Sequence, residues 1–215
     1  MNFNPLTYIY KPSGNPGAYT LLLLHGTGGN EHDLIPLAEN FGNTYDILSV
    51  RGNVSENGMP RFFKRLGMGV FDEADLHFRT DELVAFVKQL SEKEGFDAGK
   101  VIALGYSNGA NIAGAALVKY PDFLAGAILY RPMQPFKQLE PSAQAKAVPV
   151  FFSSGRLDQT VDPAATEQYV ENLKNTGFDV AYHELPAGHN LTQQDVALSA
   201  QWLNDFLAFN PLKPF

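Results

Sequence analysis

A serine between two glycines is the first residue of this chain whose setting could support chemistry. Residues 105–109 read Gly-Tyr-Ser-Asn-Gly; they follow an apolar run that predicts a strand and precede small residues that predict a helix. This is the G-x-S-x-G elbow in the strand–turn–helix context that it requires. So sharp a turn strains the serine backbone and needs glycines where neighbouring segments approach. Ser107 is therefore the predicted nucleophile; the alternative is a glycine-rich turn in which Ser107 only caps the helix.

A histidine must accept the proton of such a serine, and a carboxylate must orient that histidine. Behind an elbow of this type, the acid and then the histidine are expected to follow the serine along the chain. Two histidines follow Ser107. His183 lies inside a predicted strand, 180–185, whereas His189 lies in a turn between the last predicted strand and the last predicted helix. His189 is the predicted general base, and an exposed loop histidine without a chemical role is the alternative.

Two aspartates compete to be the acid. Asp158 follows the predicted strand 148–153 after a short turn, which is the usual position for this residue. Asp162 directly precedes Pro163. An aspartate that caps a helix with proline at its first position has a sufficient structural reason to be there. Asp158 is therefore the predicted acid, and Asp162 remains the alternative.

Acyl transfer also needs two N–H donors that stabilise the oxyanion of its intermediate. The backbone amide of Asn108, directly after the nucleophile, is predicted to be one of them. The backbone amide of Thr27 is predicted to be the other, in the loop 25–30 that reads His-Gly-Thr-Gly-Gly-Asn. A phosphate-binding loop is the alternative, but this run lacks the G-x-G-x-x-G order and the lysine of a P-loop. His25 is expected to organise the loop by hydrogen bonding.

The elements that must position these residues alternate between strand and helix. Apolar runs predict strands at 19–24, 45–50, 100–105, 124–129, 148–153 and 180–185. Helical spacing of apolar residues predicts helices at 31–41, 80–93, 108–119, 164–175 and 192–209. This alternation predicts an α/β fold with a mostly parallel sheet and helices on both faces. No linker or repeat is visible, so residues 1–215 are expected to form a single domain.

The composition excludes several classes of protein. The 215 residues include 16 Lys and Arg against 23 Asp and Glu, a net charge of −7, and no basic run. Binding to nucleic acid or to an anionic membrane is therefore not expected. The absence of cysteine excludes disulfides, thiol nucleophiles and cysteine-based metal sites. No signal peptide or membrane-spanning run is visible in the sequence, which predicts a cytoplasmic location without membrane insertion.

With these residues identified, the chain resembles the α/β-hydrolase superfamily and, within it, the small phospholipase/carboxylesterase family, which includes acyl-protein thioesterases. The motifs that carry the resemblance are LLLLHGTGG from Leu21, GYSNG from Gly105, SGRLD from Ser154 and the pair Gly188-His189. Residues 51–63 and 70–72 are similar to a branch of bacterial hydrolases linked to aromatic or quinone catabolism. The resemblance implies a triad of Ser107, Asp158 and His189.

The chain is too short for a lid domain of the size that lipases carry, and one long irregular stretch, about 51–76, is the only candidate for a substrate wall. Long loops in compact domains are usually functional. The candidate pocket residues are Met59, Phe62, Phe63 and Phe71, with Met133 from a second apolar cluster. The alternative is that these side chains only pack the loop on the body of the protein.

The expected activity is hydrolysis of a small-molecule carboxylic ester through an acyl-enzyme, with no cofactor and no metal ion. Acyl thioester or lysophospholipase-type hydrolysis, or a perhydrolase, could use the same site. A non-catalytic ligand-binding module is the less favoured alternative, because it would have little need for all three triad residues. Monomer and homodimer are both compatible with the sequence.

Overall fold

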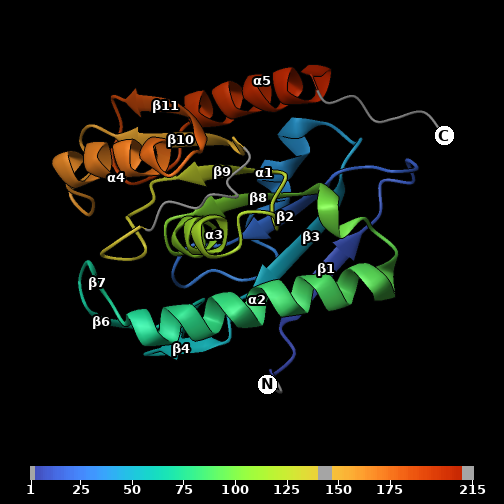
Figure 1. Cartoon of the computed structure of the whole chain (residues 1–215), viewed down its shortest axis with the longest axis horizontal. Helices are drawn as coiled ribbons and strands as arrows, with labels where there is room; N and C mark the ends of the chain where they lie inside the picture. The colour runs from blue at the N-terminus through green and yellow to red at the C-terminus, as the bar shows by residue number, and fades with distance from the viewer. Residues whose placement is uncertain (1–2, 140–146, 210–215) are drawn as a thin grey trace.

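A seven-stranded sheet forms the centre of the molecule (Figure 1). The computed structural model describes residues 3–139 and 147–209. The strand order is β1-β3-β2-β8-β9-β10-β11; β1 is antiparallel to β3, and the other neighbouring strands are parallel. The strands are β1 Thr7–Lys11, β2 Thr20–Leu24, β3 Asp46–Arg51, β8 Val101–Tyr106, β9 Gly126–Tyr130, β10 Pro149–Gly155 and β11 Asp179–Leu185.

Helices cover both faces of this sheet. They are α1 Ile35–Ala38, α2 Glu73–Glu94, α3 Asn108–Lys119, α4 Pro163–Asn175 and α5 Gln193–Phe209, with short 3-10 helices at Glu39–Phe41 and Ala98–Lys100. Side chains alternate between the faces of a strand. Leu22 and Leu24 therefore belong to the buried cluster that includes side chains of α2, α3 and α4, whereas Leu21 and Leu23 belong to the cluster that includes side chains of α1 and α5. The predicted α/β architecture is confirmed.

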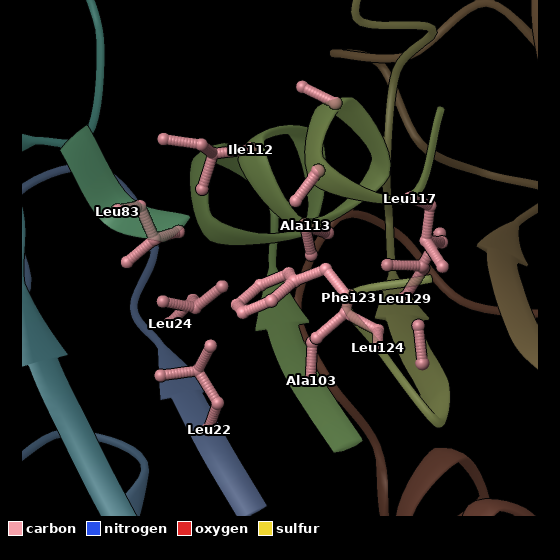
Figure 2. Close-up of a cluster of buried hydrophobic side chains, with 14 of the residues drawn as sticks. Leu22, Leu24, Leu83, Ala103, Ile112, Ala113, Leu117, Phe123, Leu124 and Leu129 are labelled. Atoms are coloured by element: carbon pink, nitrogen blue, oxygen red, sulfur yellow. The ribbon is translucent and has the colours of Figure 1, made fainter. Parts of the chain in front are cut away.

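Small side chains let α3 approach the sheet closely. Figure 2 shows Ile112 and Ala113 of α3 facing Leu22 and Leu24 of β2, with Leu83 of α2 at the edge of the same cluster. The alanines and glycines of α3 are buried over most of its length. This packing holds the start of α3 rigidly at the end of β8. No helix within the described ranges is long and apolar enough to span a membrane.

Three segments differ from the sequence prediction. The strand β1 was not predicted. The predicted helix at 31–41 is only the single turn of α1 followed by a 3-10 turn, with Pro36 in its first turn. Proline favours that position because it has no N–H to donate. Conversely, α2 begins at Glu73 and not at residue 80, because the Asp72 side chain accepts a hydrogen bond from the amide of Asp75 and caps the helix.

The stretch predicted to be irregular contains two small hairpins. The first pairs β4 (Val54–Glu56) with β5 (Met59–Arg61), and the second pairs β6 (Arg65–Gly67) with β7 (Val70–Phe71). Asn57 and Gly58 join β4 to β5 with positive φ angles of 52° and 82°. Asn-Gly is the usual pair for such a tight turn, so the sequence carries a local signal for the first hairpin. The stretch predicted to be irregular is therefore partly regular structure.

A buried histidine ties the loop after β2 to the loop after β3. His25 Nε2 lies 3.1 Å from the amide nitrogen of Gly52, and Nδ1 lies 2.6 Å from the carbonyl oxygen of Gly26. Because an amide only donates, Nε2 must be the acceptor and Nδ1 must carry the proton. Burial lowers the pKa of His25, although the Gly26 carbonyl opposes this effect. His25 is thus a neutral, hydrogen-bonded organiser of its loop, as expected from the sequence.

His25→Gln tests this contact through stability. The folded protein disfavours a protonated His25, so the unfolded chain binds more protons below the ordinary pKa of 6.5 and the free energy of unfolding falls as the pH drops. Glutamine accepts a hydrogen bond but does not titrate. Denaturant unfolding between about pH 7.5 and about pH 5.5 should therefore show a smaller loss of stability in the variant than in the wild type. The same pH dependence in both proteins would contradict this role.

Candidate active site

The turn at Ser107 joins β8 to α3 with a strained backbone. Its φ of 52° and ψ of −112° are unusual for any residue other than glycine. A Cβ atom at Gly105 would lie 2.6 Å from the backbone of Ala110, and one at Gly109 would overlap the carbonyl oxygen of Leu24. The amide of Ser107 donates to the carbonyl of Tyr130 at the end of β9, at 2.9 Å. Close backbone contacts therefore hold the serine at the carboxyl end of the sheet.

Three side chains predicted from the sequence meet at this end of the sheet. His189 Nε2 lies 2.9 Å from Ser107 Oγ, and His189 Nδ1 lies 2.7 Å from Asp158 Oδ2. A carboxylate only accepts, so Nδ1 carries the proton and Nε2 is free to accept the serine hydroxyl proton. Loops after β8, β10 and β11 bring these residues together although they are far apart in sequence. The arrangement is that of a nucleophile with its base and the acid that orients the base.

The carboxylate of Asp158 is itself held in place. Its Oδ1 accepts hydrogen bonds from the amides of Thr160 at 2.7 Å and Val161 at 3.2 Å. Its side chain is almost completely buried, whereas a quarter of the His189 side chain remains exposed. Backbone amides thus fix one oxygen and leave the other for the histidine. His189 therefore keeps access to the surface while Asp158 does not.

The alternative acid and base have other positions. Asp162 caps α4, with its Oδ1 accepting from the amide of Ala164 at 3.0 Å, and Pro163 occupies the first helical position. His183 lies within β11, where its ring stacks on that of Phe151 at 4.9 Å between centroids. Both residues have the structural settings that the sequence patterns suggested for them.

The two amides expected at the oxyanion lie in the loop after β2 and at the start of α3. The amide of Asn108 is in the first turn of α3, where N–H groups have no partner within the helix. In the other loop, the amide of Gly28 donates to Pro60 and that of Gly29 donates to Gly26. The Thr27 hydroxyl accepts from Arg61 at 2.7 Å, which anchors this residue to β5. Hydrogen bonds to β5 and within the loop thus fix the segment that contains the Thr27 amide.

The candidate pocket residues divide into two groups. Phe62 and Phe63 are 3% and 0% exposed and belong to the hydrophobic core, which favours the packing role. Phe71 is half-buried with its ring edge against Phe63. Met59 is 40% exposed and lies next to Gly28, in the loop after β2. Met133 approaches Gly69, in the turn of the second hairpin. Met59 and Met133 are the candidates that could still meet a substrate.

Two functional candidates were missed from the sequence. The hydroxyl of Tyr106 donates to the carbonyl of His189 at 3.2 Å. The guanidinium of Arg131 donates to the carbonyls of Gly188 and Asn190. The only signal in the sequence was a charged residue directly after a buried apolar strand. Within the described part of the chain, no group of three or more His, Cys, Asp or Glu side chains could hold a metal ion.

Comparisons with known proteins agree with this geometry. Residues 8–207 match the family model described as Phospholipase/Carboxylesterase. MhqD of Bacillus subtilis (strain 168) is 46% identical over 185 residues, which cover 86% of this chain and 92% of MhqD. The crystal structure of the Bacillus cereus carboxylesterase superposes with a TM-score of 0.90 at 42% identity and covers 94% of both chains. A carboxylesterase from Mesorhizobium loti gives a TM-score of 0.86 at 27% identity, covering 93% of this chain and 94% of that one.

The matched residues span the elbow, the loop after β2 and all three side chains that meet at Ser107. The strand order and the helices on both faces are those of the α/β-hydrolase fold that these relatives share. Both findings lead to the same assignment. The chain belongs to the phospholipase/carboxylesterase family of α/β-hydrolases.

Proposed function

We propose that this protein hydrolyses carboxylic esters of small molecules by a serine nucleophile and an acyl-enzyme. The observation that carries the proposal is the unbroken line of hydrogen bonds from Asp158 through His189 to Ser107. Its direction is set, because Asp158 can only accept and Ser107 must then donate. The family membership supports an ester as the substrate.

The reaction begins when Ser107 Oγ attacks the carbonyl carbon of the ester. His189 Nε2 takes the hydroxyl proton, and the ionised Asp158 stabilises the imidazolium that forms. The amides of Thr27 and Asn108 stabilise the oxyanion; losing one such donor typically costs about 2.7–4 kcal/mol. His189 then gives its proton to the departing alkoxide, which leaves an acyl group on Ser107.

Water completes the cycle. His189 removes a proton from a water molecule, whose oxygen attacks the acyl carbonyl, and the same proton returns to Ser107 as the acid leaves. A thioester would follow identical steps with a thiolate as the leaving group. The two substrate classes therefore have to be compared by rate, with the acyl group kept the same.

Ser107→Ala tests the nucleophile. The wild type should hydrolyse p-nitrophenyl esters in a series from acetate to decanoate, and the variant should lose at least about a thousandfold in kcat. A thioester with the best acyl group of that series, assayed alongside, would show which leaving group is preferred. A fluorophosphonate probe should label the wild type but not the variant. Absence of both turnover and labelling in the wild type would contradict the proposal.

Asp158→Asn and Asp162→Asn form a matched pair that tests the acid. Asparagine at position 158 would leave the imidazole in the wrong tautomer, so kcat should fall by about 10³–10⁴-fold. Asparagine also caps helices well, so Asp162→Asn should change neither kcat nor thermal stability appreciably. Loss of activity in the second variant with activity kept in the first would reverse the assignment.

Met59→Ala and Phe63→Ala separate a substrate contact from a core contact. Met59 is exposed beside the oxyanion loop, so its truncation should shift the preferred acyl chain length while leaving the unfolding midpoint near its wild-type value. Phe63 is fully buried, and its truncation should reduce the free energy of unfolding by about 3–5 kcal/mol. An unchanged chain-length profile in Met59→Ala would exclude Met59 from the pocket.

A further inference from the structure

Arg131 is a charged residue in an unusual setting. It directly follows β9, its side chain is fully buried, and its φ of 53° is disfavoured for an arginine. Its amide donates to the carbonyl of Ser153 on the neighbouring strand at 2.8 Å. Strain of this kind persists only where the surrounding structure enforces it. The guanidinium of Arg131 reaches both the Ser153 hydroxyl on β10 and the loop that carries His189.

A buried carboxylate orients the guanidinium. Asp195, in the first turn of α5, accepts from Arg131 Nη1 at 2.7 Å and from Nη2 at 2.9 Å. It also accepts from the Ser153 hydroxyl and from the amide and hydroxyl of Thr192. Burial raises the pKa of Asp195, but these hydrogen bonds lower it by more, so the pKa lies below the ordinary value of an aspartate. The carboxylate therefore stays ionised. The fork of Arg131 is thereby fixed in one plane.

The remaining donors of Arg131 hold the backbone on either side of His189. Arg131 Nε donates to the carbonyl of Gly188 at 3.0 Å, and Nη2 donates to that of Asn190 at 3.3 Å. The carbonyl of His189 itself accepts from the Tyr106 hydroxyl at 3.2 Å. Side chains at the ends of β8 and β9 thus donate hydrogen bonds to three consecutive carbonyls of the loop. Rotation of the loop, which would move the imidazole, would break these contacts.

The same strand end also holds the nucleophile. The carbonyl of Tyr130 accepts from the amide of Ser107, and the next residue in the chain, Arg131, holds the loop of His189. Two adjacent residues therefore set the distance between the serine and the histidine. A buried ion pair adds little net stability compared with apolar residues of similar volume. The geometry of this pair points to orientation as its main contribution.

We propose that Arg131, oriented by Asp195, is a positioning residue that holds the loop of His189 so that Nε2 faces the Ser107 hydroxyl. The proposal rests on the proposed function, because it assigns the histidine as the base. The side chain of Arg131 is fully buried, so it presents no surface to a substrate. Its loss should therefore lower kcat and leave KM nearly unchanged. A displacement of about 1 Å between reacting groups can cost on the order of a hundredfold in rate.

Two variants and one control test the proposal. Arg131→Lys keeps the charge but replaces the planar fork by a single ammonium, which cannot reach both carbonyls and the carboxylate in the same geometry. The double variant Arg131→Met, Asp195→Asn removes both buried charges together, so neither is left unpaired. Arg156→Met is the matched control. It removes an arginine–carboxylate pair with Glu184 at the same end of the sheet, but on an exposed side chain.

Two readouts apply to each variant that shows the wild-type circular dichroism spectrum. The first is kcat and KM for the best p-nitrophenyl ester. The second is the proton resonance of His189 Nδ1–H, identified by its loss in Asp158→Asn; it reports on the Asp158–His189 hydrogen bond without any substrate. We expect a roughly ten- to hundredfold fall in kcat, a KM within about twofold of the wild type, and a shifted or broadened resonance. The control should match the wild type.

A folded Arg131→Lys variant with wild-type kcat and an unchanged resonance would overturn the proposal. A fall in kcat or a change in the resonance that is as large in Arg156→Met as in Arg131→Lys would also overturn it. If the double variant does not fold, Arg131→Lys decides the question alone. If the wild type cleaves no ester, the proposed function fails and the resonance alone decides. A resonance that changes in Arg131→Lys but not in Arg156→Met then supports the positioning role, and one that does not change refutes it.

Discussion

The close backbone contact around the turn after β8 is the constraint on which the rest of the structure depends. Ser107 has a conformation that side chains resist, and it is stable there because Gly105 and Gly109 allow the main chains of α3 and β2 to approach. The small residues of α3 extend this close packing over the central strands. The turn at Ser107 is thus held in place by the packed core beneath it. The backbone strain at Ser107 is offset by the burial of side chains along α3.

Polar contacts act together with apolar packing to position the loops around that turn. His25 connects the loop after β2 to the segment after β3, and the side chain of Asn108 accepts a hydrogen bond from the amide of Phe62 at 2.8 Å. Asn111 does the same for the amide of Met133. Each contact satisfies a buried backbone amide that would otherwise be costly. All these groups are paired only when the loops have this one geometry. The candidate site needs such order because its residues come from the ends of four strands, β2, β8, β10 and β11.

Two arginine–carboxylate pairs at this end of the sheet differ in burial and in what they hold. The ion pair of Arg131 and Asp195 is fully buried, whereas Arg156 and Glu184 form theirs near the surface. The buried pair has directional hydrogen bonds to the His189 loop, and the surface pair has none to that loop. Arg61 is also buried, and it donates to the Thr27 hydroxyl and the Phe63 carbonyl, so both buried arginines of the described chain hold loops at this end of the sheet.

The order Ser107, Asp158, His189 and the glycines around the serine could be predicted from the sequence, because short-range spacing encodes the turn and the strand ends that follow it. The parallel sheet was predictable for the same reason, since its buried strands are continuous apolar runs. The hairpin at 54–61 has a local signal in its Asn57-Gly58 turn, whereas the burial of Phe62 and Phe63 in the core depended on packing between distant segments. The hold of Arg131 on Gly188 and Asn190 joins residues more than fifty positions apart. Only the tertiary structure could decide that contact, because no local pattern specifies which backbone carbonyls a guanidinium will reach.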